Sequence, residues 1–452
     1  MQSKHFLIAG AGIAGLSHAL ALCRSGHRVQ VLEQSAQLQA VGAGIQLGPN
    51  ALRRLDQLGL LATLQSKGAQ PNAVAIRSLA NGQLIKKLDL RAIKNRYDYP
   101  VLCIHRAALQ QTLLDACMDE AHFSLLTNKK IESVKNTKSG VLVHTAAAQT
   151  APANNDSKDL DSSNLASPRL DSPNLTSPNI YPPEATQIFA ADALIAADGL
   201  WSRTRQQIIG DGPPNPTGKI AFRAVMPLDA LTGDNLPDGL ADQTGLWLGA
   251  NAHLVHYPVG ESGYTGDSDH SGDSAPIGNA AKQLNIIVMM RGNNRIDHWQ
   301  QASTKTLLLQ QLQLAHPQNI APIVKHLLET IAQCSAWTLF DRPVINRWYD
   351  GNICLTGDAA HPMQAHLAQG ASMAIEDALT MTTALNTSET MPAAFAKFNA
   401  QRLDRTSHAM RKAKQYGNIY QASWPVSFAR DCFLKSPVSS WNAAGMDWLY
   451  RG

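Results

Sequence analysis

Three short glycine-containing segments carry the residue types needed to hold a phosphate-bearing dinucleotide. The first occupies residues 10–15 (GAGIAG), between an apolar run and a stretch rich in Ala and Leu. In this pattern Gly10 allows a tight turn, Gly12 lets the backbone approach a pyrophosphate, and Gly15 permits close packing of a helix on a strand. The N–H groups at the start of that helix would then face the anion. The pattern predicts a dinucleotide-binding turn, with a purely structural glycine turn as the alternative.

An acidic residue, Glu33, ends the next predicted strand, 18 residues after Gly15. A carboxylate at this point can accept hydrogen bonds from the ribose hydroxyls of an adenosine, and it disfavours a 2′-phosphate. This first unit alone is compatible with either NAD or FAD.

Two distant segments have a related pattern, in which a buried strand runs into a turn with glycine and aspartate. Residues 194–205 place Asp198 and Gly199 after the strand, and residues 351–362 place Gly357 and Asp358 after theirs. The second segment continues through Gln369-Gly370-Ala371 into a predicted helix. We expect the three turns to converge in space around one dinucleotide.

Together these segments resemble the flavoprotein aromatic hydroxylases, the single-component family that includes salicylate hydroxylase, 3-hydroxybenzoate 6-hydroxylase and 6-hydroxynicotinate 3-monooxygenase. The similarity runs nearly end to end, apart from two insertions. The resemblance implies FAD as the cofactor, with NADH or NADPH and O2 as co-substrates. It also implies hydroxylation of a small phenolic or carboxylated aromatic substrate through a flavin C4a-hydroperoxide.

The resemblance assigns parts of the cofactor to particular segments. The first turn would hold the ADP half of FAD, residues 198–199 would serve both FAD and the transient visit of NAD(P)H, and residues 357–358 would contact the ribityl chain. Residues 41–50 resemble a flavin-adjacent loop, and the positive end of the helix at residues 370–371 would stabilise reduced flavin. The expected FAD-binding residues are Gly10, Gly12, Ala14, Gly15, Glu33, Gly44, Arg106, Asp198, Gly199, Gly357, Asp358, Gln369, Gly370 and Ala371; no metal ligand is expected.

The substrate side is expected to contain His253, Tyr257, His366, Arg223 and Gln46. His253 and Tyr257 are four residues apart on a predicted strand and so share a face. In the resembling hydroxylases the matching His and Tyr point at the substrate, where a general base would polarise the phenol. The alternatives are a core histidine for His253 and a surface salt bridge for Arg223.

Hydrophobic patterning predicts the elements that position these residues. The fold class is α/β, with a Rossmann-like FAD-binding lobe interleaved with a mixed-sheet substrate lobe and C-terminal helices. The positive charges of the last long helix are interpreted as a solvated face. Strands are predicted at 5–9, 28–32, 140–145, 187–197, 220–226, 252–257 and 284–290, and helices at 13–25, 107–118, 372–386 and 392–416.

These elements divide the chain into four parts. The FAD-binding domain is discontinuous (1–75, 100–146, 186–215 and 337–390), the substrate domain covers 76–99 and 216–336, and a helical segment covers 391–452. Residues 147–185 are rich in Ser, Asn, Asp and Pro and are predicted to be a disordered insertion. A second polar insertion is predicted at 260–282, and both should tolerate deletion.

Composition excludes several other classes of protein. The net charge of +4 over 452 residues is too small to indicate a nucleic-acid binder. The six cysteines form no CxxC pair, which favours buried thiols in a cytoplasmic, reducing setting. No run of 18 apolar residues predicts a membrane span, and the apolar N-terminus, which superficially resembles a signal peptide, is interrupted by glycines. We expect a monomer or a homodimer.

Two other functions share these sequence features. One is a flavin monooxygenase that acts on a quinone precursor or a polycyclic compound. The other is a non-catalytic flavin-binding redox protein. The segment containing His253 and Tyr257 favours a small aromatic substrate over the first of these, and the rate of NAD(P)H oxidation with added ring compounds would distinguish the second.

Overall fold

The computed structural model describes residues 2–38, 43–147, 187–231, 239–240, 242–260, 283–292, 300–317, 319–436, 439 and 442–451. The insertions predicted at 147–185 and 260–282 lie outside the described residues apart from their first residue, and so do Val41 and Gly42 of the flavin-adjacent loop. Within the described part of the chain, no helix is both long and apolar enough to cross a bilayer.

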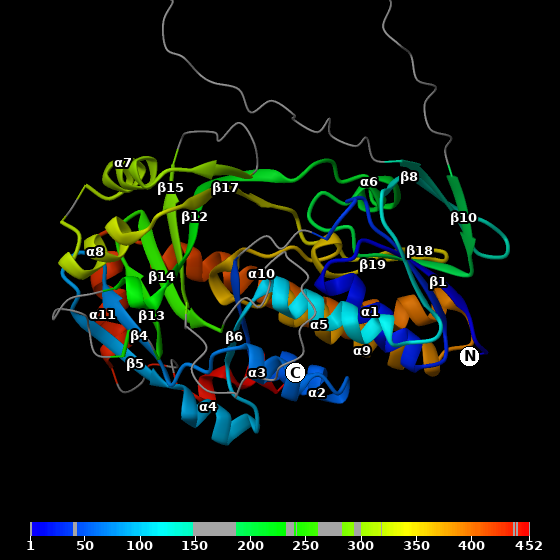
Figure 1. The fold of residues 1–452 in the computed structure, drawn as a ribbon, viewed down its shortest axis with the longest axis horizontal. Helices are drawn as coiled ribbons and strands as arrows, with labels where there is room; N and C mark the ends of the chain where they lie inside the picture. Colours follow the sequence, from blue (N-terminus) through cyan, green and yellow to red (C-terminus); the bar gives the residue numbers. More distant parts are fainter. Residues whose placement is uncertain are drawn as a thin grey trace, which may run out of the picture.

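A six-stranded sheet, parallel except at one edge, forms the first half of the molecule, as predicted for a Rossmann-like lobe (Figure 1). Of its two middle strands, β11 (Ala193–Ala196) is fully buried and β1 (His5–Ala9) is buried except at His5, and α1 (Ile13–Arg24) packs against both α5 (Arg106–Met118) and α9 (Gly370–Asn386). Buried parallel strands of this kind read as continuous apolar runs. The strand order is β18 (Tyr349–Asp350), β19 (Ile353–Leu355), β11, β1, β2 (Arg28–Leu32) and β7 (Phe123–Leu126).

Strand register brings the three predicted turns together. Ala9 of β1 is paired with Ala196 of β11, and Leu355 of β19 is paired with the same Ala196. The glycine-containing turns that follow these strands therefore lie side by side at the carboxyl edge of the sheet, where ligands bind in open α/β folds.

The strand predicted at 187–197 is two strands in different sheets. β10 (Gln187–Ala191) pairs with β9 (Val141–Ala147), whereas β11 joins the parallel sheet. The break falls at Asp192, whose carboxylate accepts hydrogen bonds from the His5 backbone N–H (2.8 Å) and from Lys4 (3.3 Å). The apolar run is continuous in sequence, so hydrophobic periodicity alone could not reveal that the chain changes from one sheet to the other here.

The second half of the molecule is an eight-stranded mixed sheet, confirming that prediction (Figure 1). Alternate residues point to opposite faces. Leu254, Ile286 and Val288 pack into a core with residues of α7 (Lys305–Ala315) and α8 (Pro322–Thr330), while the opposite face carries His253 and Tyr257. The order is β16 (Gln300–Ser303), β17 (Cys334–Asp341), β12 (Asn215–Pro227), β15 (Gln283–Arg291), β14 (Ala252–Val259), β13 (Gln243–Leu248), β4 (Ala73–Ser78) and β5 (Leu84–Asp89).

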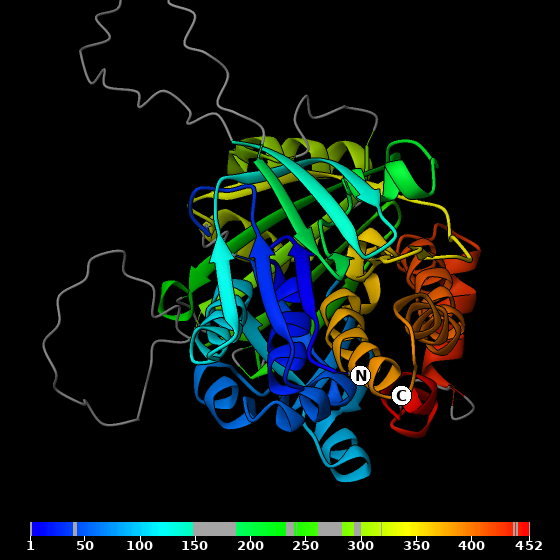
Figure 2. The same cartoon turned by 90° about the vertical axis from the view of Figure 1, so that its right-hand side faces the viewer.

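A long helix, α10 (Met391–Tyr420), connects the two halves. It contacts β18 of the parallel sheet and also α11 (Val426–Lys435), which contacts β5 of the mixed sheet. Figure 2 shows these C-terminal helices, in orange and red, to one side of the parallel sheet. The remaining elements are β3 (Gly44–Leu47), α2 (Pro49–Gln57), α3 (Leu61–Lys67), α4 (Leu90–Tyr97), β6 (Leu102–His105), β8 (Lys129–Asn136), α6 (Arg203–Ile208) and α12 (Asp447–Tyr450).

The cysteines largely follow the prediction. All six are free thiols, and five of them are buried, but Cys432 on α11 is exposed.

Candidate active site

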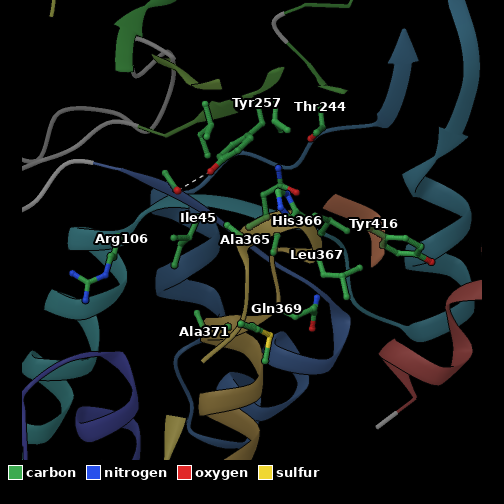
Figure 3. Close-up of a pocket in the computed structure, with 18 of the residues that line it drawn as sticks. Ile45, Arg106, Thr244, Tyr257, Ala365, His366, Leu367, Gln369, Ala371 and Tyr416 are labelled. Atoms are coloured by element: carbon green, nitrogen blue, oxygen red, sulfur yellow. Dashed lines mark hydrogen bonds between the residues drawn. The ribbon is translucent and has the colours of Figure 1, made fainter. Parts of the chain in front are cut away.

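A cavity of about 470 Å³ lies where the carboxyl edge of the parallel sheet meets the inner face of the mixed sheet. Figure 3 shows Tyr257, Thr244 and His366 gathered in one part of it, with Arg106 set apart on α5. Five predicted residues, Gly10, Gly15, Glu33, Asp198 and Gly357, do not line it. The predicted residues that do are Gly12, Ala14, Gly44, Gln46, Arg106, Gly199, Arg223, His253, Tyr257, Asp358, His366, Gln369, Gly370 and Ala371.

The glycines of the first turn have two different roles. Gly10 has a φ of +94°, and a Cβ there would lie 2.8 Å from the Ala197 carbonyl oxygen. A Cβ on Gly15 would overlap the Gly10 carbonyl. Gly12, in contrast, has no protein atom within 4 Å of its virtual Cβ, and α1 begins next to it without a side-chain cap. Gly10 and Gly15 are therefore required by the fold, whereas Gly12 leaves open space beside free helix N–H groups.

Glu33 lies beside this turn, outside the cavity. One carboxylate oxygen accepts a hydrogen bond from the Ala11 backbone N–H, and the other accepts one from the Ser35 N–H, both at 2.8 Å. Each oxygen keeps a second lone pair. The carboxylate can therefore brace the turn and still accept a hydrogen bond from a ribose hydroxyl.

The other two turns place carboxyl groups at the edge of the sheet. Asp198 accepts a hydrogen bond from the Thr204 backbone N–H at 3.2 Å, and burial raises its pKa. The Asp358 side chain lines the cavity and is enclosed by the protein. Burial therefore raises its pKa, against the lowering effect of the His361 and Arg106 charges. Gly199, with a φ of +74°, has open space around it.

Helix α9 begins at Gly370, on the wall of the cavity, with no side-chain cap and no acidic residue in its first turn. Helix α1 starts at the same cavity in the same way. Two uncapped helix starts, with open space at Gly12 and Gly199, form a site suited to an anion and an adjoining ring. These residues fit the pyrophosphate and ring of FAD.

A buried ionic network holds the Gly357-Asp358 turn against the C-terminal helices. Arg402 on α10 donates to Asp377 (2.7 Å) and to Glu376 (2.6 Å), both on α9. Asp377 in turn accepts hydrogen bonds from the Thr356 hydroxyl and the Gly357 backbone N–H. The network fixes the turn relative to the start of α9.

The positive charges of the long helix are therefore not all on a solvated face, and that prediction was wrong for its central turns. Arg402 is 4% exposed, and Arg405, at 17% side-chain exposure, pairs with Glu376 at 2.7 Å. Charged residues are almost never buried unless paired. Their partners, Glu376 and Asp377, lie 25 or more positions away, and no local sequence signal linked the two segments.

A second buried cation, Arg205 on α6, ties two of the turns together. Its guanidinium donates to the carbonyls of Ala359 and Ala360, each at 3.1 Å, and forms an ion pair with Asp211. Arg205 therefore connects the segment after Gly199 to the segment after Asp358.

His253 and Tyr257 lie on the cavity face of β14, as their spacing predicted. The Tyr257 hydroxyl donates to the Gly44 carbonyl at 2.6 Å, so its ring lines the cavity while its hydroxyl fixes β3 (Figure 3). His253 is fully buried. Its Nδ1 faces the Gln421 side-chain amide at 3.2 Å, and its Nε2 has no partner among the described residues. Burial lowers the pKa of His253 well below 6.5.

His366 approaches His253 from the loop before α9. The two ring centroids are 5.1 Å apart, and neither nitrogen of His366 has a hydrogen-bond partner in the described part of the chain. Burial, with a contribution from the Lys219 charge, lowers the pKa of His366 to about 3. Both imidazoles are therefore neutral near pH 7. Both residues line the cavity, and three of their four ring nitrogens have no hydrogen-bond partner among the described residues.

Arg223 on β12 also lines the cavity, instead of forming the surface salt bridge considered as the alternative. Its guanidinium carbon lies 5.1 Å from the centroid of the Trp337 ring, and its Nε has no partner among the described residues. Burial lowers the pKa of Arg223, but a guanidinium stays protonated in proteins. Gln46 on β3 lines the same space.

Sequence reasoning missed most of the apolar wall of the cavity. Its side chains come from strands, a short helix and the chain end, and no motif connects them. The segment 446–450, close to the end of the chain, supplies part of it. The missed lining residues include Val74, Leu88, Leu90, Val101, Leu246, Met446, Leu449 and Tyr450.

Comparison with known proteins gives one family match over most of the chain. The model described as "FAD binding domain" matches residues 4–155 and 176–413. The chain is 28% identical over 447 residues to 3-hydroxybenzoate 6-hydroxylase of Polaromonas naphthalenivorans, covering 98% of this chain and 95% of that protein. It is 27% identical over 414 residues to 6-hydroxynicotinate 3-monooxygenase of Pseudomonas fluorescens, covering 91% of this chain and 90% of that one.

Solved structures share the fold at lower identity. The salicylate hydroxylase substrate complex aligns with a TM-score of 0.72 at 20% identity, over 100% of this chain and 96% of that chain. Klebsiella pneumoniae HpxO, solved with FAD and uric acid, aligns with a TM-score of 0.73 at 20% identity, over 95% of this chain and 92% of that chain.

Proposed function

Because the chain belongs to the FAD-binding domain family, we propose that it is an FAD-dependent monooxygenase that hydroxylates a small phenolic or carboxylated aromatic compound. NADH or NADPH would be the reductant and O2 the source of the oxygen atom. The observation that carries the proposal is the pair of neutral, unsatisfied imidazoles in the same cavity as the glycine turns. The names of the relatives, which are hydroxylases of ring carboxylates and hydroxypyridines, support it.

Bound FAD would accept a hydride from the nicotinamide and, with O2, supply an electrophilic oxygen atom. The chain would place that cofactor with backbone groups. The open space at Gly12 and the uncapped start of α1 suit the pyrophosphate, while the start of α9 directs positive potential at the flavin ring. Arg106 and Asp358, which both line the cavity and whose charges interact, suit the polar chain of the cofactor.

At the other end of the cavity, side chains would hold the substrate. The nitrogens of His253 and His366 suit a ring hydroxyl, and the Arg223 guanidinium suits a carboxylate. Aliphatic residues such as Leu246 and Ile287 line the remaining wall and would exclude water from the reacting atoms.

The test is a panel of ring compounds added to the purified yellow protein with NADH or NADPH and O2. Salicylate, 3-hydroxybenzoate and 6-hydroxynicotinate would be scored by stimulated NAD(P)H oxidation and by an oxygenated product. That product is one oxygen atom heavier than the substrate or, where hydroxylation expels the ring carboxylate, has gained one oxygen atom and lost CO2. The proposal predicts stimulation with a matching product for at least one of them. A basal rate that none of the compounds alters, with no oxygenated product, would contradict it.

The apolar wall favours one second candidate, oxygenation of a larger phenol. The same cavity is also lined by Leu88, Leu90 and Met446. A two-ring compound such as 1-hydroxy-2-naphthoate, included in the same panel, distinguishes the two. Product from the two-ring compound alone would favour the second candidate.

A further inference from the structure

One side chain lies directly behind His253 without lining the cavity. Gln421, the residue that follows α10, is fully buried. Its amide nitrogen lies 3.0 Å from the Met289 carbonyl oxygen and 3.2 Å from Nδ1 of His253. The backbone carbonyl of Gln421 accepts a hydrogen bond from the Asn251 N–H, which ties this residue to the start of β14.

The Met289 carbonyl determines which way the Gln421 amide points. A carbonyl oxygen can only accept, so the group facing it must be the NH2 of the amide. The reverse orientation would put two oxygens against each other and leave both amide hydrogens without acceptors. The same NH2 group is the one that faces His253, and its second hydrogen is therefore available to Nδ1.

An imidazole that accepts a hydrogen bond at Nδ1 carries its single proton at Nε2 while it is neutral. His253 meets this condition, because burial and the neighbouring His366 and Lys219 all disfavour its cationic form. Nε2 is buried and has no partner among the described residues, and the ring lines the cavity.

We infer that Gln421 is a positioning residue that holds His253 in the Nε2–H tautomer, so that His253 donates a hydrogen bond to a substrate oxygen and does not take its proton. As far as it concerns a substrate, the inference rests on the proposed function. It specifies the kind of ligand group that fits at this point, namely an oxygen with a free lone pair or a negative charge, such as a phenolate or a ring carbonyl.

His366 differs from His253 in this respect. Neither of its nitrogens faces a fixing donor or acceptor within the described residues, so its tautomer is free to follow the ligand. Helix α10 makes room for it at Gly417, where a Cβ would overlap the His366 ring. His366, 5.1 Å from His253 between ring centroids, can therefore present either a donor or an acceptor to a ligand oxygen.

The direct test reads the tautomer itself. The full FAD-loaded chain would be labelled with ¹⁵N-histidine and examined by NMR at neutral pH, with His253→Asn identifying the signals of His253. The expected result is an unprotonated Nδ1 and a protonated Nε2. A protonated Nδ1 on His253 in the unsubstituted chain would overturn the inference.

Two variants of Gln421 extend the test. Gln421→Glu replaces the donor with an acceptor and is expected to move the proton to Nδ1, while the near-isosteric Gln421→Met removes the donor and should give a mixture of tautomers. Gln415→Glu, on the exposed side of the same helix, is the control and should leave the His253 signals unchanged. An unaltered His253 pattern in both Gln421 variants would reject the role of Gln421.

Turnover adds a second readout. With a panel compound that is hydroxylated, Gln421→Met is expected to lower kcat/KM for that compound about tenfold or more while FAD content is unchanged. The reason is that His253 then carries a proton at Nε2 in only part of the molecules, so the charged substrate oxygen loses its hydrogen-bond donor in the rest. If no compound is hydroxylated, the proposed function fails, but the NMR result still decides the tautomer. If the unsubstituted chain hydroxylates a panel compound but its His253 carries the proton at Nδ1, the inference fails and the proposed function stands.

Discussion

The two ends of the cavity are built in different ways. The cofactor end is made of backbone: three turns at neighbouring strand ends and two uncapped helix starts, with Gly12 and Gly199 leaving space. The substrate end is made of side chains from β12, β14 and the loop before α9, backed by α10. Backbone turns depend on local sequence, whereas the side-chain end depends on how distant elements pack. The first should therefore tolerate few substitutions, and the second should change function without losing the cofactor.

The largest expected effect comes from the buried network behind the cofactor end. Arg402→Met leaves Glu376 and Asp377 without their shared buried cation. The free energy of unfolding should fall by about 3–5 kcal/mol, as when one partner of a buried pair is removed. Denaturant unfolding measures this. Arg411→Met, exposed on the same helix, is the control and should change stability by less than about 0.5 kcal/mol. Equal losses in the two variants would contradict the role of the network.

The same network should make the cofactor end sensitive to acid. Burial alone would raise the pKa of Glu376, but the Arg405 hydrogen bond and the Arg402 charge outweigh it and lower the pKa from 4.5 to about 2. The unfolded chain binds the proton first, so stability is full above about pH 4.5 and falls toward pH 2, by about 3 kcal/mol. Unfolding free energies measured across this range should show the loss, and Glu376→Gln should flatten it.

Gly12→Val tests the backbone-made end without disturbing the fold. Its φ of −74° is allowed for valine, and a Cβ there meets no atom within 4 Å other than those of its chain neighbours, so the added side chain starts in open space on the cavity wall. Losing two charge-assisted hydrogen bonds costs about 3 kcal/mol, or roughly a hundredfold in FAD affinity. FAD titration measures the affinity for FAD, and thermal unfolding of the apoprotein checks that the fold is undisturbed. Gly12→Ala should lose less FAD affinity than Gly12→Val. Full yellow colour in Gly12→Val would count against this assignment.

Substitution at the side-chain end should lower product formation without loss of FAD. His253→Ala should retain FAD and lower the coupled yield of hydroxylated product by about tenfold to a hundredfold, because a substrate oxygen loses its donor. FAD absorbance and product mass are the two readouts. His122→Ala, an exposed histidine far from the cavity, should change neither. An unchanged product yield would remove His253 from the mechanism.

The smallest effect is expected at Gly417, where α10 passes His366. Alanine in a helix interior is favoured over glycine by about 1 kcal/mol, but a Cβ here would overlap the imidazole. Gly417→Ala should raise KM for an accepted substrate a few-fold, with kcat and FAD content nearly unchanged. Steady-state kinetics checks this, and an unaltered KM would show that His366 has room to move.

The contrast also explains what the sequence could predict. Residues 10–15, Asp198-Gly199 and Gly357-Asp358 each encode a strand followed by a special turn, and strand pairing then brings them together. The alternation along β14 likewise placed His253 and Tyr257 on one face. Gln421 carried no local signal, because its role comes from Met289 and His253, more than a hundred residues away. Arg402 was misread for the same reason: exposure cannot be judged without knowing what covers a helix.

One measurement tests most directly whether a single cavity joins the two ends. The FAD-loaded chain would be titrated with salicylate or 3-hydroxybenzoate while the visible spectrum of the flavin is recorded. We predict a saturable perturbation of the flavin bands, weakened in His253→Ala and His366→Asn although both variants retain FAD. A colourless chain that cannot be reconstituted with FAD, or a perturbation identical in all three proteins, would contradict the account.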